Sequence, residues 1–184
     1  MPYSHLNDFP ADIRERAAAV RLACFDVDGT LTPGSLVIGE AGEMAKHFHV
    51  HDGLGMKLLR EAGIEIALVT ARRSPIVDAR ARELGITRVH QGVGDKRECL
   101  LSLCAGLSLQ PGQSSFMGDD LGDLPALSVA GLAVAPDNAH PWVRERVHWR
   151  TRHAGGQGAA RELCDLLLAA SGRAEAVLAR YTGA

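Results

Sequence analysis

The sequence lacks an excess of basic residues, and this excludes one broad class of partner. Its 184 residues contain 20 Lys and Arg against 22 Asp and Glu, so the formal net charge is −2 at pH 7. Proteins that bind nucleic acid or an anionic membrane surface through their overall charge need a basic field. We therefore expect no nucleic acid and no membrane among the partners of this chain.

Long hydrophobic runs and paired cysteines are missing as well. No stretch approaches the length of a membrane span, and the N-terminus has no basic segment followed by an apolar one, so no export signal is predicted. No two cysteines show the C-x-x-C spacing of many metal and redox sites. We expect reduced thiols in a cytoplasmic protein, at Cys24, Cys99, Cys104 and Cys164.

What the sequence does contain is a regular alternation of strand and helix patterns. Short β-like runs are found at 20–25, 64–69, 88–90, 115–117 and 132–134, and amphipathic stretches at 53–62, 75–84, 96–105 and 121–130. This alternation predicts an α/β fold, a doubly wound, Rossmann-like parallel sheet with helices on both faces. The length predicts a single domain over 1–184.

One segment interrupts the alternation. Residues 36–50 read as two short strands around a glycine-rich turn, inserted between the first strand and its helix. The segment is too small for an independent cap domain. Because an isolated hairpin is marginally stable, we expect it to pack on a copy of itself in another subunit. A surface flap that packs on nothing is the alternative.

Reactive side chains follow the expected strands. Asp26 and Asp28 come after the first strand, Thr70 ends the second, Lys96 opens a helix, and Gly118-Asp-Asp-Leu-Gly-Asp123 follows the fourth. Asp28-Gly29 alone would indicate only a turn. In an open α/β sheet, however, ligands bind at the carboxyl ends of the strands, where all these groups fall.

Together these groups suit the transfer of a phosphoryl group. The negative charge of a phosphoryl group repels a carboxylate nucleophile, so a divalent cation and a lysine must neutralise it before attack. Mg²⁺ suits this task because it prefers oxygen ligands and keeps positions open for phosphate and water. The sequence therefore predicts a magnesium-dependent phosphoryl-transfer site.

The motifs resemble, in order and spacing, those of the haloacid dehalogenase superfamily of phosphotransferases. The first is Asp26-Val-Asp-Gly-Thr30, and the resemblance covers the chain from Val20 onward. Within the superfamily the chain is similar to the capless branch that includes the 3-deoxy-D-manno-octulosonate 8-phosphate (KDO 8-phosphate) phosphatases. The segments that carry this closer likeness include His51-Asp-Gly-Leu-Gly-Met56, Thr70-Ala-Arg72 and Ala154-Gly-Gly-Gln-Gly-Ala159.

The resemblance implies a role for each matching residue. Asp26 would be the nucleophile that becomes phosphorylated, and Asp28 would protonate the leaving alkoxide and then activate water. Phosphate and substrate contacts are implied for Gly29, Thr70, Arg72, Lys96 and His51.

A Mg²⁺ site is implied on the same grounds. The ion would be held by the carboxylates of Asp26 and Asp119 and by the backbone carbonyl of Asp28, while Asp120 and Asp123 would orient its waters. His47, His49 and His51 alternate as strand neighbours do, but nothing in the sequence supplies a convincing fourth ligand for zinc.

Three positions depart from the usual pattern of the branch. His51 and Gln157 stand where arginine is usual, and Ala71 stands where glycine is usual. The replacement of two arginines affects how the anionic part of the substrate can be recognised. It does not affect the residues expected to carry out the phosphate chemistry. The expected substrate is a small sugar-acid phosphate, most simply KDO 8-phosphate.

Two other functions remain open at this point. One is a phosphatase for a nine-carbon sugar-acid 9-phosphate, and the other is a non-catalytic subunit of a phenylphosphate-carboxylating complex. The complete set of catalytic residues favours an enzyme over the subunit. The resemblance also implies a homotetramer in which the hairpins pack together and the Gly155–Gly158 loop and the C-terminal tail, about 172–184, approach a neighbouring site.

Overall fold

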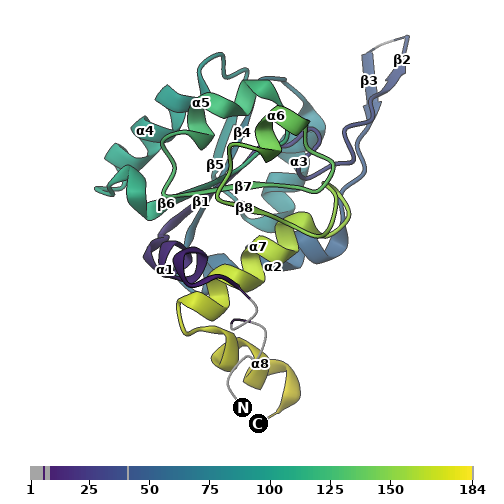
Figure 1. Ribbon diagram of the computed structural model, residues 1–184. Helices are drawn as coiled ribbons and strands as arrows, with labels where there is room; N and C mark the ends of the chain where they lie inside the picture. The colour runs from purple at the N-terminus through teal and green to yellow at the C-terminus, as the bar shows by residue number, and fades with distance from the viewer. Residues whose placement is uncertain (1–5, 7–8, 41, 184) are drawn as a thin grey trace.

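The computed structural model describes residue 6 and residues 9–40 and 42–183. Six strands form a parallel sheet in the order β5-β4-β1-β6-β7-β8 (Figure 1). They are β1 (Leu22–Phe25), β4 (Glu65–Thr70), β5 (Arg88–Gln91), β6 (Ser114–Met117), β7 (Leu132–Ala135) and β8 (Trp149–Arg150). The predicted α/β fold is confirmed. Residues 1–5 and 7–8, part of the segment where no export signal is predicted, lie outside the described residues.

The central strands are buried on both faces, which explains why they read as continuous apolar runs. All four residues of β1 are buried, and successive side chains point to opposite faces. Ala23 and Phe25 therefore belong to one hydrophobic cluster, and Leu22 and Cys24 to a second on the other face. The first cluster includes residues of the helices at 11–19, 50–61, 75–84 and 159–170, and the second includes residues of the helices at 96–106, 124–127 and 141–144.

All four expected helices are present, two of them with clearly different bounds, and the structure adds further helices. Their bounds are α1 (Ala11–Ala19), α2 (Val50–Glu61), α3 (Pro75–Leu84), α4 (Lys96–Gly106), α5 (Leu124–Leu127), α6 (Pro141–Arg144), α7 (Ala159–Ala170) and α8 (Ala174–Thr182), with 3₁₀ turns η2 (Pro111–Gln113) and η3 (Leu121–Asp123). Helix α2 starts before the expected 53–62. The helix expected at 121–130 is short, because Asp120 and Asp123 form a capped 3₁₀ turn and Pro125 lies in the first turn of α5.

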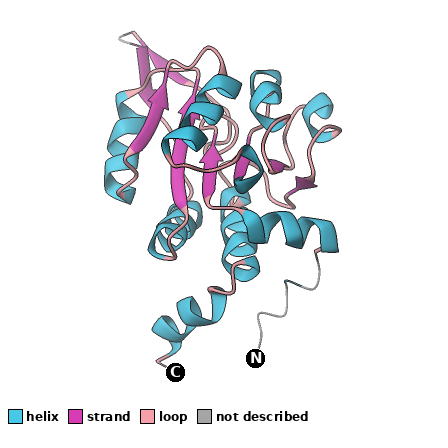
Figure 2. Ribbon diagram, turned by 90° about the vertical axis from the view of Figure 1, so that its left-hand side faces the viewer, coloured by secondary structure: helices cyan, strands magenta, loops and turns pink. Residues whose placement is uncertain are grey.

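The inserted hairpin projects from the body of the molecule in both views (Figures 1 and 2). It consists of β2 (Val37–Gly39) and β3 (Gly42–Ala45), an antiparallel pair within the expected 36–50. Apolar side chains are exposed on it: Ile38 is 59% and Met44 is 68% exposed. A loop over residues 46–49 then leads back to the start of α2.

The chain after Gly172 forms helix α8, at the end of the molecule opposite the hairpin (Figures 1 and 2). An ion pair of 2.8 Å between Arg180 Nη1 and Glu61 Oε2 joins it to α2. The segment expected as a tail is therefore largely helical and packs on its own chain. None of the described helices is long and apolar enough to cross a membrane.

Candidate active site

The carboxyl ends of the central strands place most of the predicted residues around one cavity. Strand β1 lies between β4 and β6, so the segments that follow these three strands meet at one edge of the sheet. A cavity of about 230 Å³ opens there. It is lined by Asp26, Asp28, Thr70, Ala71, Arg72, Val93, Gly94, Lys96, Asp120, Gly122 and Asp123.

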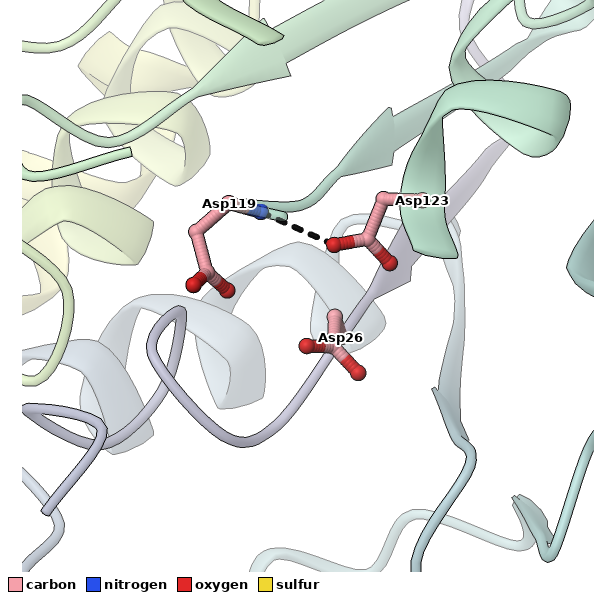
Figure 3. A group of neighbouring side chains, drawn as sticks. All are labelled: Asp26, Asp119 and Asp123. Carbon is pink, nitrogen blue, oxygen red and sulfur yellow. Dashed lines mark hydrogen bonds between the residues drawn. The ribbon is translucent and has the colours of Figure 1, made fainter. Parts of the chain in front are cut away.

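Three carboxylates form the acidic centre of the site (Figure 3). Asp26 follows β1, Asp119 follows β6, and Asp123 ends η3. One oxygen of each lies within 4.8 Å of the others, and no other group of three potential metal ligands this compact occurs among the described residues. Clustered carboxylate oxygens are suitable ligands for Mg²⁺. The donor set therefore fits the expected ion.

Burial and mutual repulsion make these carboxylates reluctant to ionise. Burial, followed by repulsion from Asp123, raises the pKa of Asp26 to about 7, although Lys96 lowers it. Burial and Asp123 likewise raise the pKa of Asp119 to about 6. A cation bound among these groups would favour their ionised forms and so compete with protons.

Lys96 is the buried positive charge of the site. Its Nζ donates to Asp26 Oδ1 at 2.7 Å and to Asp123 Oδ1 at 2.6 Å. Burial opposes its charge, but the two carboxylates outweigh burial and raise the pKa of Lys96. Asp95 fixes the start of α4, and hence Lys96, because its side chain accepts hydrogen bonds from the backbone N–H groups of Arg97 and Glu98.

Asp123 uses both of its oxygens within the protein. Oδ1 accepts from Lys96, while Oδ2 accepts from the backbone N–H groups of Asp119 at 2.9 Å and Asp120 at 3.1 Å. Asp26 and Asp119 are thus better placed than Asp123 to coordinate a metal directly. Asp120 is exposed and caps η3 by accepting from Leu121 N.

Gly29 is required by the close approach of Asp119. Its φ is +93°, and a Cβ at this position would lie 2.1 Å from Asp119 Oδ2. Thr30 Oγ1 donates to Asp119 Oδ1 at 3.0 Å. Thr30 was not predicted as a site residue, although it is the last residue of the first motif. Together, Gly29 and Thr30 fix the Asp119 carboxylate beside the turn that carries Asp28.

The hairpin and the residue that directly follows it supply two site residues that the sequence analysis missed, Glu43 on β3 and Lys46. Lys46 Nζ contacts Asp28 Oδ1 and lies 2.8 Å from Glu43 Oε1, and the Lys46 side chain is only 2% exposed. Glu43 Oε2 accepts a hydrogen bond from Ser74 Oγ at the start of α3. The available signal was a Glu and a Lys three residues apart in an otherwise largely apolar hairpin.

Thr70 and Arg72 lie where the sequence placed them. Thr70 is buried at the end of β4, and its Oγ1 accepts from Arg72 N at 3.3 Å. The Arg72 side chain is half exposed, with Nε 3.9 Å from Asp28 Oδ2 and Nη2 3.9 Å from Glu43 Oε1. Arg72 is therefore a half-exposed cation in the lining of the cavity.

His51 does not line this cavity. It is exposed on the first turn of α2, where its ring packs edge-on against His49 at 5.0 Å. Its neighbour Asp52 is buried instead, and Oδ1 accepts from Arg161 N at 2.8 Å. Asp52 thus joins α2 to the start of α7, a role that no sequence motif indicates.

The Gly155–Gly158 loop packs against the turn that carries Asp28 in its own chain. Gly156 N donates to Thr30 O at 3.0 Å, and a Cβ on Gly155 would lie 1.8 Å from Gly29 O. Gly155 N also donates to Asn138 Oδ1 at 2.7 Å. Besides any contact with a neighbouring subunit, this loop therefore supports its own active-site turn.

Comparisons with known proteins agree with this geometry. The model of the haloacid dehalogenase-like hydrolase family matches residues 85–163. A 3-deoxy-D-manno-octulosonate 8-phosphate phosphatase of Yersinia pestis is 43% identical over 164 residues, which cover 89% of this chain and 88% of that protein.

Two solved structures extend the comparison. A hypothetical protein from Xanthomonas campestris is 56% identical, with a TM-score of 0.94 over 98% of this chain and 99% of the other. The phosphatase of Moraxella catarrhalis, crystallised with magnesium, phosphate and KDO, is 36% identical, with a TM-score of 0.91 over 94% and 99% of the two chains. The chain therefore belongs to the haloacid dehalogenase-like hydrolases and, within them, to the family of 3-deoxy-D-manno-octulosonate 8-phosphate phosphatases.

Proposed function

We propose that this protein hydrolyses KDO 8-phosphate to KDO and phosphate in the cytoplasm, with Mg²⁺ as cofactor. The observation that carries the proposal is the convergence of Asp26, Lys96 and the acidic cluster on one cavity that Asp28 and Thr70 also line. Family membership adds the substrate. Four free cysteines agree with a reducing compartment.

The first half of the reaction transfers the phosphoryl group to the protein. An Asp26 carboxylate oxygen attacks phosphorus while the bond between phosphorus and the sugar oxygen breaks. Asp28 gives its proton to that oxygen, so the sugar leaves as a neutral alcohol. Lys96 and Thr70 bind the phosphoryl oxygens and oppose their charge.

The second half regenerates the enzyme. Asp28, now a carboxylate, takes a proton from water as the water oxygen attacks the phosphorus of phosphorylated Asp26. Inorganic phosphate leaves, and Asp26 returns to a carboxylate. Asp26, Asp119 and the Asp28 carbonyl would hold magnesium, which would supply the positive charge that lets an anionic nucleophile approach an anionic phosphate.

The cavity is large enough for the phosphate and a few neighbouring atoms, not for an eight-carbon sugar acid as a whole. The rest of the substrate would extend past Arg72, whose guanidinium suits a carboxylate. His51 and Gln157, which replace two arginines of the branch, do not line the cavity of the single chain. Any contact they make with the sugar acid would come from a neighbouring subunit.

A phosphate-release screen tests the substrate. With Mg²⁺, we expect kcat/KM for KDO 8-phosphate to exceed that for hexose 6-phosphates by at least about 10²-fold, because only the sugar acid offers a carboxylate to the Arg72 guanidinium. A nine-carbon sugar-acid 9-phosphate is the matched comparison. Faster turnover of the nine-carbon compound would replace the proposed substrate, and the absence of any phosphatase activity would favour a non-catalytic subunit.

We further propose that the single domain assembles as a homotetramer through its hairpins. Ile38 and Met44 expose apolar side chains on a two-stranded sheet that is marginally stable alone. A copy of the same hairpin is the simplest cover, because a symmetric contact buries the same patch on both subunits.

Charged substitutions on the hairpin test this assembly. Ile38→Asp combined with Met44→Lys should shift the mass from tetramer toward monomer in light scattering at micromolar concentration, because both charges would have to be buried at the contact. Trp142→Asp, an apolar-to-charged change at an exposed position on α6, is the control and should leave the mass unchanged. A wild-type monomer with full activity on KDO 8-phosphate would contradict the proposal.

A further inference from the structure

Asp28 is held by only one of its two carboxylate oxygens. Oδ1 contacts the Lys46 ammonium. Oδ2 is buried and accepts no hydrogen bond from the part of the chain that the structure describes, and Arg72 Nε lies 3.9 Å away. One oxygen is thus fixed by a protein cation while the other remains available for a proton.

Lys46 is itself fixed from the opposite side. Its Nζ lies 2.8 Å from Glu43 Oε1, and Glu43 accepts a hydrogen bond from Ser74 at the start of α3. The side chains of Glu43 and Lys46 are 12% and 2% exposed, so neither is free to swing into solvent. A continuous chain of contacts therefore runs from α3 through the hairpin to Asp28.

This placement matters because proton transfer depends on geometry before it depends on acidity. A general acid must lie within about 2.6–3.2 Å of the oxygen that it protonates. Asp28 sits on a turn next to Gly29, and nothing else among the described residues holds its carboxylate by a close contact. Without Lys46 the carboxyl group could rotate away from the leaving oxygen.

We propose that Lys46, oriented by Glu43, is a positioning residue that aims Asp28 Oδ2 at the oxygen of the leaving group. The inference rests on the proposed phosphatase function and adds Glu43 and Lys46 to it. It also gives the hairpin a task inside its own subunit, in addition to any role in assembly.

The leaving group provides the test, since only a poor leaving group needs a proton. Lys46→Met keeps the length of the side chain and removes the ammonium. For KDO 8-phosphate, whose leaving oxygen is an alkoxide, kcat/KM should fall about 10²-fold. For p-nitrophenyl phosphate, whose leaving group departs as a stable anion, the loss should stay below about 10-fold. Lys46→Arg should recover part of the loss with KDO 8-phosphate.

The use of kcat/KM limits the comparison to the steps up to phosphorylation of Asp26, where the leaving group departs. Lys57→Met, at an exposed position on α2, is the matched control and should match wild type with both substrates. Glu43→Gln should show the same dependence on leaving group as Lys46→Met, with a smaller loss of kcat/KM. If Lys46→Met fails to fold, Glu43→Gln takes its place in the test.

Equal losses with the two substrates would overturn the inference, because a residue that binds phosphate or only supports the fold affects both alike. No loss with either substrate would overturn it as well. Failure of the proposed function is distinguishable on wild-type protein. A different natural substrate would leave p-nitrophenyl phosphate hydrolysed and KDO 8-phosphate poorly hydrolysed, and a protein without phosphatase activity would release phosphate from neither compound.

Discussion

Asp26→Asn is expected to abolish phosphate release while leaving the fold intact. The amide has the shape of the carboxylate but cannot form the phosphorylated intermediate, so kcat should fall by at least about 10⁴-fold. Initial rates with KDO 8-phosphate at saturating Mg²⁺ measure the effect. Asp12→Asn makes the same chemical change at an exposed position on α1 and should retain full activity.

The same variant should be at least as stable as wild type when magnesium is removed. The raised pKa of Asp26, about 7 against 3.8 for a free side chain, means that the folded protein binds this proton more tightly than the unfolded chain. Its contribution to stability is therefore complete below 3.8 and is lost as the pH rises through about 7. The melting temperature of chelated wild type should fall over this range more than that of Asp26→Asn.

Active Asp26→Asn protein would show that another group is the nucleophile. Loss of secondary structure by circular dichroism would instead indicate that Asp26 is needed for folding, in conflict with the repulsion that it experiences from Asp123. The two results are separable because activity and unfolding are measured on the same purified sample.

Removal of magnesium is expected to eliminate activity and to lower the melting temperature. Asp26, Asp119 and Asp123 place three carboxylates within 4.8 Å of one another, and Lys96 is the one cation among the described residues that donates hydrogen bonds to them. Magnesium at 100 times its dissociation constant would stabilise the fold by about 2.7 kcal/mol. For a chain of this size, that corresponds to a rise of roughly 5–10 °C.

Chelator followed by excess Mg²⁺ should therefore abolish and then restore both activity and melting temperature. Ca²⁺ should restore the melting temperature but not the activity, because its larger and looser coordination shell misplaces nucleophile and phosphate. In Asp119→Asn the rise in melting temperature caused by Mg²⁺ should be smaller, whereas in Asp12→Asn it should equal that of wild type. Activity that survives exhaustive chelation would contradict the metal site.

The sequence predicted the residues that directly follow strands better than those that come from elsewhere. Asp26, Thr70 and Asp119 were located correctly because a parallel sheet brings the ends of neighbouring strands together. Glu43 and Lys46 escaped prediction because the contact of Lys46 with Asp28, and that of Glu43 with Lys46, depend on the path of the inserted segment in space, which spacing along the chain does not reveal.

Competition between neighbouring side chains explains the other differences between the predicted and the observed structure. His51 shares the first turn of α2 with Asp52, and Asp52 is the side chain that turns inward, since it accepts a hydrogen bond from Arg161 N. In the segment 121–130 the side chains of Asp120 and Asp123 bond to nearby backbone N–H groups, which favours a tight turn over a long helix. The first outcome depends on a partner far along the chain and the second on partners within the turn itself, and an apolar periodicity reveals neither.

The order of the strands also affects how the protein can fold while it is being synthesised. Strand β1 leaves the exit tunnel early, yet its two neighbours, β4 and β6, end at Thr70 and Met117, and the loop that supports Gly29 comes later still. Until then the nascent chain carries an apolar strand with unpaired edges, a known template for aggregation. Translation that stalls before β6 should therefore yield aggregation-prone fragments without catalytic activity. During synthesis, chaperones should bind mainly at β1.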